Sequence, residues 1–552
     1  MLYSPQIQKQ AAHLLEKLTL RQKIGQMIQF NQIHIRNLAK CHQLEDLLKI
    51  YPFGSIFSGT DIIDLAGKKI PGLEVVDLLQ KNSAIPLLVS GDLESSVNGV
   101  SFPSQIALGA ANDPQLAYEF GTAIAQAGRK QGFSWTFAPV VDIPMHLQEQ
   151  LGCRALGSDP ERVARLASQI IRGMQEHGLN ATAKHFPGDG ASVINQHISL
   201  GSNILSEKEW RNTFGKVYQQ VFASGVRAVM AGHIAMPWLD DSGLPATLSG
   251  KICRDLLRDD LGFEGVLVSD ALIMSGYVAF KDYAKRLITS INAGIDVLLW
   301  PDPNAFDIIE KAVEYGDINI ERINEAAQRV LEMKAATAAY IPASECEEID
   351  CSEVAGKIAE KGTVLTRNRG NILPLDKNKV KNILLFIADY SDKMNNDPAD
   401  PRWKWIIEGL EGHGAKVDIR ICNSCLALHN YEKDGGRSDA VIVLFTQKPV
   451  YGTRIHGVAL EGLWLMSYCE KHNPIGVSML SPHLAAESPI APGAMIHMCS
   501  NCPESQKALV RLLYGEIPFN TVNPMQFPVD DSALDAWDKI TWGNKYSQLI
   551  DQ

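Results

Sequence analysis

Six polar or ionisable side chains each close a short apolar run in the N-terminal part of the chain. They are Asp92, Asp142, Lys184, His185, His233 and Asp270. Carboxylates and a lysine hydrogen-bond readily to vicinal hydroxyl groups, and a carboxylate can attack or stabilise an anomeric carbon. If these side chains converge, the sequence predicts a site that binds a sugar and cleaves its glycosidic bond. The alternative for any single one is a structural role, as a helix cap or an ion-pair partner.

The apolar runs predict the scaffold that would bring these side chains together. Eight runs rich in Val, Ile, Leu and Phe alternate with amphipathic stretches. Continuous apolar strands separated by helices indicate parallel pairing with both faces buried, so the expected fold is α/β with an N-terminal (β/α)8 TIM-type barrel. The active site of such a barrel lies at the carboxyl ends of its strands. The predicted strands are Ile24–Phe30, Phe53–Ser58, Pro86–Asp92, Ser134–Asp142, Ala181–His185, Val226–His233, Gly265–Asp270 and Gly294–Trp300.

A second domain is expected after a change of composition near residues 335–355, where an alanine-rich stretch is followed by an acidic one. We therefore predict a catalytic barrel over residues 1–340, a linker over 341–355 and an αβα sandwich over 356–552. No glycine-rich phosphate-binding motif follows a strand in the second domain, so a nucleotide site is not expected there. Its predicted strands are Ile383–Ala388, Ala440–Phe445, Gly476–Leu480 and Met495–Cys499.

Composition excludes several classes of protein. The chain has 552 residues, of which 45% are hydrophobic and 21% charged, values that are typical of globular proteins. A net charge of -11 and the lack of a basic run argue against nucleic acid or an anionic membrane as the main partner. Residues 1–30 lack the apolar core of a signal peptide, and no apolar stretch reaches the ~20 residues that span a bilayer, so the expected location is cytoplasmic.

The cysteines suggest neither a disulfide framework nor a metal site. The chain has 10 cysteines, too few for its length to form a disulfide scaffold. The pairs Cys422/Cys425 and Cys499/Cys502 each have CxxC spacing, which can contribute to a zinc or redox site. The pairs lie much farther apart than in a zinc ribbon, so coincidence is the preferred interpretation. We expect no metal and no cofactor.

Two segments carry a resemblance to a known family. Residues 184–190 read KHFPGDG and are followed by AsnGlnHis at 195–197, which resembles the KHFPGHG…DSH segment of glycoside hydrolase family 3 enzymes of the β-N-acetylglucosaminidase type. Residues 262–274, GFEGVLVSDALIM, are similar to the nucleophile strand of that family, GFxGVxxSDDLxM. Shorter similarities occur at 86–92, 102–110, 112–114, 137–143, 154–160, 231–234, 245–249, 370–375 and 513–519. The resemblance thus extends over nearly the whole chain.

This resemblance implies a function and a role for each matching residue. It implies an exo-acting retaining β-glycosidase, with β-N-acetylglucosaminidase as the first choice, acting on a small oligosaccharide or glycoconjugate. Asp270 would be the nucleophile that forms a covalent glycosyl-enzyme, and His197 the general acid/base. Four side chains would hold the hydroxyls of the −1 sugar, and two of them, Lys184 and Arg154, would lower the pKa of Asp270. The four are Asp92, Arg154, Lys184 and His185.

The loop that carries His197 departs from the family pattern. Asn195 stands where the family has the Asp that orients this His, so no carboxylate from that position can stabilise protonated His197. Asp189 replaces the second His of KHFPGHG and could supply a negative charge if the loop folds back; the alternative is a solvated loop carboxylate. Asn195 and Asp189 are therefore candidates for acid/base support. Residues 92–98 depart from the DQEGGR that the family commonly has, and Ala271 stands where a second Asp is usual. The missing Arg puts specificity beyond the −1 sugar in question.

Three alternatives stay open at this point. A His acid/base allows inorganic phosphate to approach a glycosyl-enzyme without meeting a second negative charge, so the chain could be a β-glycoside phosphorylase. A β-glucosidase of the same family is the second alternative. The third alternative is a sugar-binding protein whose catalysis is impaired because Asn195 replaces the dyad Asp.

Overall fold

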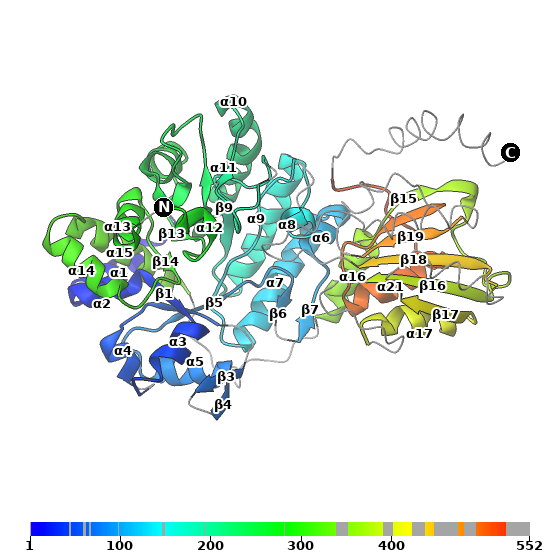
Figure 1. Ribbon diagram of the computed structural model, residues 1–552, viewed down its shortest axis with the longest axis horizontal. Helices are drawn as coiled ribbons and strands as arrows, with labels where there is room; N and C mark the ends of the chain where they lie inside the picture. The colour runs from blue at the N-terminus through cyan, green and yellow to red at the C-terminus, as the bar shows by residue number, and fades with distance from the viewer. Residues whose placement is uncertain are drawn as a thin grey trace. The chain divides into compact units, whose positions relative to one another are not determined.

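The structure is a computed structural model of an α/β protein, the class that the sequence predicts (Figure 1). The chain forms two compact units. Unit 1 comprises Met1–Val100, Pro114–Ile143 and Pro160–Cys351, and unit 2 comprises Ser101–Asp113, Pro144–Asp159 and Ser352–Gln552. The structure describes residues 2–43, 46–58, 62–65, 68–97, 99–145, 149–192, 194–280, 282–337, 351–389, 401–421, 437–446, 473–479 and 493–525.

Unit 1 is built around a ring of parallel strands. Five of them pair in the order β14-β1-β2-β5-β8 and three in the order β13-β11-β9. Isolated parallel bridges, Trp135 to Asn180 and Val268 to Val297, join the two sheets at both ends, so the pairing continues around the whole ring. The strands are β1 (Ile28–Asn31), β2 (Ser55–Phe57), β5 (Leu88–Gly91), β8 (Trp135–Thr136), β9 (Thr182–Phe186), β11 (Ala228–Ala231), β13 (Val266–Ser269) and β14 (Leu298–Leu299).

Each of these strands overlaps one predicted run. Strand β1 starts later than its predicted run. The run Ile24–Phe30 begins inside helix α2 (Leu20–Gln26), because Thr19 forms a reciprocal capping box with Gln22 and starts a helix that continues through Gln26. Strand β1 therefore occupies only the end of the run. Apolar residues alone do not distinguish the last turn of a buried helix from a buried strand.

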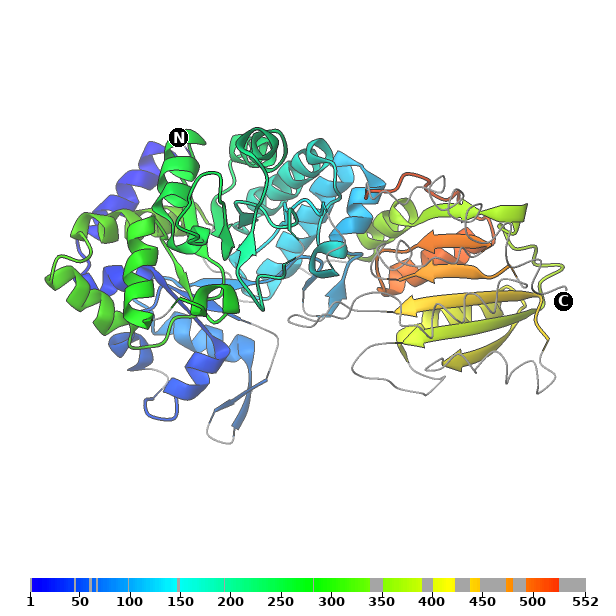
Figure 2. The ribbon, with the colours of Figure 1, turned by 45° about the horizontal axis from the view of Figure 1, so that its top comes forward.

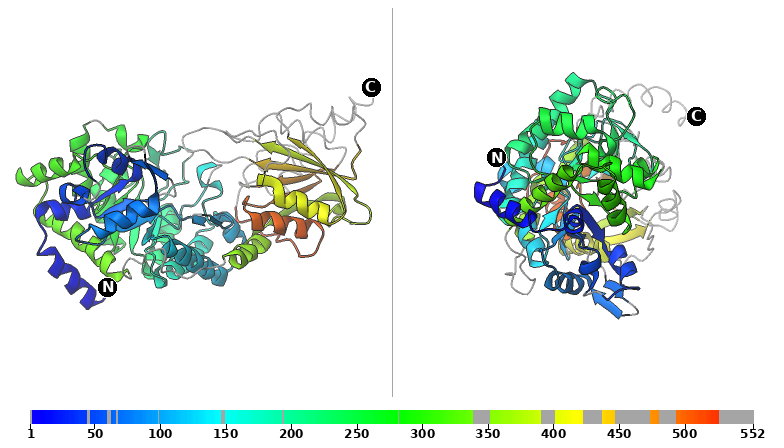
Figure 3. Two further views of the ribbon diagram at one scale, coloured as in Figure 1. Left: turned by 90° about the horizontal axis from the view of Figure 1, so that it is seen from below. Right: turned by 90° about the vertical axis from the view of Figure 1, so that its left-hand side faces the viewer.

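Helices follow the strands of unit 1 and are seen from two further sides in Figure 3. Helices α7 (Pro114–Lys130) and α9 (Pro160–Glu176) pack so closely that a Cβ at Gly121 would lie 2.3 Å from the Ile170 carbonyl oxygen. The other helices are α1 (Pro5–Leu15), α3 (Gln32–Leu38), α4 (Leu47–Ile50), α5 (Gly72–Lys81), α10 (Glu207–Trp210), η2 (Arg211–Gly215), α11 (Lys216–Ala223), η3 (Ala246–Leu248), η4 (Lys251–Asp260), α12 (Ser275–Val278), α13 (Tyr283–Ala293), α14 (Ala305–Glu314) and α15 (Ile320–Ala336). The short strands are β3 (Ile62–Leu65), β4 (Lys68–Pro71), β6 (Ser96–Val97), β7 (Val100–Ser101), β10 (Gly201–Ser202) and β12 (Ile234–Ala235).

A buried carboxylate fixes the strand that leads to Asp270. Asp296 accepts a hydrogen bond from the Leu267 N–H of β13 at 2.9 Å and forms ion pairs with Arg258, Arg322 and Arg329. Burial alone would raise the pKa of Asp296, but the three guanidinium groups outweigh it and hold the pKa below its ordinary value. The cluster therefore ties helices η4 and α15 to β13 from within the protein.

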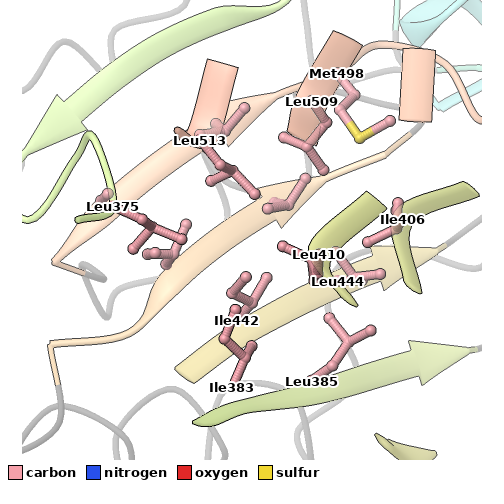
Figure 4. Close-up of a cluster of buried hydrophobic side chains, with 14 of the residues drawn as sticks. Leu375, Ile383, Leu385, Ile406, Leu410, Ile442, Leu444, Met498, Leu509 and Leu513 are labelled. Carbon is pink, nitrogen blue, oxygen red and sulfur yellow. The ribbon is translucent and has the colours of Figure 1, made fainter. Parts of the chain in front are cut away.

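Unit 2 contains a six-stranded sheet in the order β15-β20-β19-β18-β16-β17, in which only the β15–β20 pair is antiparallel (Figure 2). Its strands are β15 (Val364–Asn368), β16 (Asn382–Asp389), β17 (Lys416–Ile421), β18 (Ala440–Thr446), β19 (Ile475–Ser478) and β20 (Ala494–His497). Its helices are α6 (Gln105–Ala111), α8 (Glu149–Gly152), α16 (Ser352–Gly362), η6 (Arg369–Asn371), η7 (Pro401–Trp403), α17 (Lys404–Gly412) and α21 (Pro503–Leu513). Helices α17 and α21 contribute Ile406, Leu410, Leu509 and Leu513 to an apolar core against the sheet (Figure 4).

Some features of unit 2 lie outside the sequence expectations. The edge strands β15 and β17 were not predicted, because their partly exposed, mixed residues lack the apolar signal of the central strands. Helix α16 begins at Ser352, within the range predicted as a linker, while residues 338–350 lie outside the described residues. Residues 101–113 and 144–159, numbered within the predicted barrel, belong to unit 2. One reason is that α6 and α16 touch: a Cβ at Gly362 would lie 2.4 Å from the Ala107 carbonyl oxygen.

Two further expectations concern cysteines and membranes. Cys422 and Cys425 lie outside the described residues, whereas Cys499 and Cys502 are buried free thiols. Within the described part of the chain, no helix combines the length and apolar character needed to cross a bilayer.

Candidate active site

Lys184 of β9 and Asp92, which follows β5, form an ion pair although β8 lies between these strands in the ring. Lys184 in β9 places its Nζ 2.9 Å from Asp92 Oδ1, just after β5, and 2.8 Å from Glu94 Oε1. The Lys184 side chain is buried, whereas 53% of the Asp92 side chain is exposed. Asp92 therefore keeps carboxylate surface for a ligand while Lys184 holds it in place. Glu94 was not predicted as a site residue; its sequence signal was its position two residues after Asp92.

His185 is oriented by a buried carboxylate. Its Nδ1 lies 2.6 Å from Asp142 Oδ2, and its backbone N–H donates to Asp142 Oδ1 at 3.1 Å. Asp142 also accepts from the Asp189 N–H at 2.7 Å and is fully buried. Because an ionised carboxylate only accepts hydrogen bonds, His185 Nδ1 carries hydrogen and Nε2 is left for other contacts. Asp142 thus positions both His185 and the start of the loop that follows β9.

Asp270 follows β13 and is nearly buried, at 9% exposure. Its N–H donates to the Ala231 carbonyl at 2.8 Å, and its Oδ1 accepts from the Ala271 N–H at 2.8 Å. Burial alone would raise its pKa, but the pKa is lowered overall by His185, His233 and His197 and by the Ala271 N–H. Asp270 is therefore ionised at neutral pH.

The cause of this low pKa differs from the sequence interpretation, which named Lys184 and Arg154. The largest lowering contributions come from the three imidazoles, which that interpretation did not invoke. Lys184 already pairs with two carboxylates. Arg154 is half-buried in unit 2, so its predicted role at the sugar site stays a prediction.

His233 hydrogen-bonds, as a neutral imidazole, to the residue that follows Asp270. Its Nε2 lies 3.0 Å from the Ala271 carbonyl oxygen and its Nδ1 2.9 Å from Thr247 Oγ1. Since a carbonyl can only accept, Nε2 carries hydrogen and Nδ1 accepts from the Thr247 hydroxyl. Burial is the largest cause of a lowered His233 pKa, so the neutral form is the one present at neutral pH; the protonated form, present only at lower pH, is the one that lowers the pKa of Asp270.

Asn195 fixes the tautomer of His197. Asn195 Oδ1 accepts from the His197 backbone N–H at 2.9 Å and lies 2.8 Å from His197 Nδ1. Because a backbone N–H can only donate, the contacting amide atom is oxygen, and Nδ1 must carry hydrogen to donate to it. The lone pair of neutral His197 is then on Nε2. The Ser275 N–H donates to the His197 carbonyl at 3.4 Å, which links this loop to the segment after Asp270.

Asp189 is buried, which corrects the alternative of a solvated loop carboxylate. Its Oδ1 accepts from the Gly190 N–H at 2.7 Å and its Oδ2 from Gln196 Nε2 at 3.4 Å. Gln196 in turn accepts from the His233 N–H at 2.9 Å. Gln196, which sequence reasoning missed, therefore ties the His197 loop to the end of β11. The roles of Asp189 and Asn195 in acid/base support stay predictions.

Comparisons with known proteins identify the family of this chain. Residues 19–333 match the glycosyl hydrolase family 3 N-terminal domain, which is more than half of the chain. The chain therefore belongs to glycosyl hydrolase family 3, and the resemblance found in its sequence is confirmed. It is 31% identical over 336 residues to a beta-N-acetylglucosaminidase/beta-glucosidase of Cellulomonas fimi, covering 56% of this chain and 60% of that protein. It is 33% identical over 194 residues to a beta-hexosaminidase of Methylobacillus flagellatus, covering 35% and 55%. The chain thus spans little more than half the length of these relatives.

Solved structures extend the likeness over both units. A family 3 beta-N-acetylglucosaminidase from Paenibacillus sp. has a TM-score of 0.76 and 27% identity, covering 92% of this chain and 99% of that one. A beta-glucoside phosphorylase has a TM-score of 0.83 and 24% identity, covering 96% and 98%. At this lower identity the second likeness concerns the fold alone.

Proposed function

We propose that the strand ring of unit 1 is a (β/α)8 barrel, that unit 2 is the αβα sandwich domain, and that the chain is an exo-acting retaining β-glycosidase. The observation that carries this proposal is that Asp270, which follows β13, is buried and yet ionised, because His185, His233 and His197 lower its pKa. A carboxylate held ionised in a buried site is suited to attack an anomeric carbon. The names of the relatives favour β-N-acetylglucosamine as the sugar.

In the first step Asp270 attacks the anomeric carbon through Oδ2, because Oδ1 is engaged by the Ala271 N–H. The glycosidic bond breaks, and the leaving oxygen takes a proton from protonated His197 Nε2. In the second step neutral His197 Nε2 accepts a proton from water, whose oxygen attacks the anomeric carbon and releases Asp270. Two displacements at one carbon give net retention. The His197 tautomer set by Asn195 suits this second step.

Sugar binding is assigned to Asp92, Lys184 and His185, with Arg154 as a fourth contributor. The exposed carboxylate surface of Asp92 can accept from two vicinal hydroxyls, and Lys184 can donate to one of them. His185 has Nε2 available because Nδ1 is bonded to Asp142. The ligand is a small oligosaccharide or glycoconjugate, and no step of this mechanism requires a cofactor.

Replacement of Lys184 separates its contribution to protein stability from its contribution to sugar binding. Lys184→Met removes a cation 2.8 Å from the mostly buried Glu94 and should lower the free energy of unfolding by about 2–4 kcal/mol. It should also lower kcat/KM at least tenfold through lost sugar contacts. Adding Glu94→Gln should recover most of the stability but not kcat/KM, as judged by urea unfolding and steady-state kinetics. Full recovery of both would assign Lys184 a purely structural role; Lys285→Met, at an exposed position on α13, is the matched control.

Phosphorolysis is a second candidate, favoured by the neutral partner of His197. The Asn195 amide adds no negative charge beside His197, so phosphate approaching the glycosyl-enzyme meets no second negative charge from position 195. Inorganic phosphate would then replace water in the second step and yield a sugar 1-phosphate. Because phosphate is already an anion, His197 does not need to remove a proton from it before it attacks.

A panel of 4-nitrophenyl β-glycosides distinguishes these functions. We expect the fastest cleavage with the β-N-acetylglucosaminide, with retention of configuration detected by NMR. Reactions in phosphate buffer and in phosphate-free buffer are compared for sugar 1-phosphate, whose appearance selects the phosphorylase. Binding of sugars without cleavage of any glycoside would instead support a catalytically impaired sugar-binding protein and contradict the glycosidase.

A further inference from the structure

A cavity of about 220 Å³ lies at the end of the strand ring opposite Asp270. It lies beside Leu88, the first residue of β5, and Ser134, which precedes β8, whereas Asp270 follows the last residue of β13. Because all strands of the ring run parallel, the cavity is at their amino ends. Most of its lining is apolar, including Ala11 and Leu14 of α1, Leu87, and Leu331 of α15.

One amine lies in this apolar lining. Lys334, in the last turn of α15, lines the cavity, and its Nζ donates one hydrogen bond to Gln26 Oε1 at 2.7 Å. An ammonium has three hydrogens to donate. Among the described residues that line the cavity no carboxylate occurs, so the amine has no counter-ion there. Burial accordingly lowers the pKa of Lys334 to about 7.

The lining has three other polar side chains: Gln10, which is exposed, and Thr337 and Ser134, which are hydrogen-bonded. Thr337 Oγ1 donates to the Met333 carbonyl at 2.6 Å. Ser134 Oγ accepts from the Val89 N–H at 3.0 Å and keeps its own hydrogen to donate. The cavity therefore offers apolar surface together with donors from Lys334 and Ser134. This combination fits an apolar chain that ends in a small acceptor anion.

We propose that this cavity binds a medium-chain monocarboxylate, with its aliphatic chain against Leu14, Leu87 and Leu331 and its carboxylate on Lys334 Nζ. A neutral apolar ligand would leave the amine unpaired, which is costly in an apolar site. A phosphate dianion or a dicarboxylate would bring more negative charge than one amine neutralises. One carboxylate matches one ammonium. The proposal does not depend on the function of Asp270.

Charge balance makes this binding pH-dependent. A carboxylate binds the ammonium form of Lys334, so at a pH above 7 binding must first add a proton to the amine. Affinity should therefore fall about thirtyfold between pH 6 and pH 8.5. The charged side chains on the neighbouring elements do not line the cavity. They include Lys9 and His13 on α1, Lys23 on α2, which bonds to Asn324, and Glu332 on α15, which bonds to Gln328.

Calorimetric titration with octanoate tests the proposal, with octanol as the uncharged ligand of equal chain length. We expect octanoate to bind the intact chain at pH 6, to bind about thirtyfold more weakly at pH 8.5, and to bind better than octanol at pH 6. Each methylene removed, as in hexanoate, should weaken binding about fourfold per carbon. Octanol affinity should not fall as the pH rises, because octanol has no charge that requires the ammonium form. Equal affinity for octanoate and octanol at pH 6, or no octanoate binding at millimolar concentration, would overturn the proposal.

A substitution separates Lys334 from the rest of the molecule. Lys334→Met keeps the length and the apolar packing of the side chain but removes the amine. It should abolish both the preference for octanoate over octanol and the pH dependence, while Lys285→Met at an exposed position should change neither. Thermal unfolding of each variant checks that it is folded, and the pH and octanol comparisons on the unaltered chain stand without any variant. Retention of the pH-dependent preference in Lys334→Met would assign binding to another group and overturn the proposal.

Discussion

Asp270→Asn lowers kcat on an aryl β-glycoside by about four orders of magnitude or more, because an amide cannot form the covalent glycosyl-enzyme. The expected loss appears with good and poor leaving groups alike, since the nucleophile is needed whichever group leaves. The measurement is steady-state kinetics together with intact-protein mass spectrometry after reaction with a slow 2-fluoro glycoside. The unaltered chain gains the mass of one sugar, and the variant does not.

The structure also indicates that Asp270→Asn should fold like the unaltered chain. Asn is close in size to Asp, and it can still accept from the Ala271 N–H at the Oδ1 position. Thermal unfolding should therefore change little, and Asp241→Asn at a surface site serves as the control. In Asp270→Ala, azide can attack the anomeric carbon from the face that the carboxylate used and give the α-glycosyl azide by a single displacement. Activity close to that of the unaltered chain in Asp270→Asn would remove this residue from the mechanism.

The strand ends could be predicted from the sequence because each is marked locally. An apolar run closed by a polar residue is visible for β5, β9, β11 and β13, and in a parallel sheet those ends share one side. What the sequence could not supply are contacts between distant positions. Asp142 and His185 each close a run, but nothing local shows that the first orients the second.

Residues that act through neighbours leave the weakest sequence signal. Gln196 links Asp189 to the His233 backbone, yet an amide in a polar loop is unremarkable by composition. Asp189 was open between two interpretations because burial of a loop carboxylate depends on the N–H groups that fold around it. The membership of residues 101–113 in unit 2 depends likewise on contact between α6 and α16. Such contacts are set by the tertiary structure and not by local pattern.

Changes to the Asn195–His197 pair should separate substrates by their leaving groups. A 4-nitrophenolate leaves with little protonation, whereas the alcohol of a disaccharide requires a proton from the acid. His197→Ala should therefore reduce kcat/KM, which reports the first step, by about two to four orders of magnitude on a disaccharide and only mildly on the aryl glycoside. Equal losses on both substrates would exclude His197 as the acid.

Asn195→Asp should have the opposite effect because a carboxylate 2.8 Å from Nδ1 stabilises the imidazolium. The pKa of His197 should rise, the alkaline limb of the kcat/KM profile should move to higher pH, and disaccharide cleavage should improve more than aryl glycoside cleavage. The same negative charge opposes an incoming phosphate, so the share of sugar 1-phosphate among the products should fall. These two responses come from one charge, and they must appear together if Nδ1 of His197 faces position 195 during catalysis. An unchanged ratio of rates, with an unchanged pH profile, would place the proton donor elsewhere and leave the Asn195 contact as a structural feature of the loop.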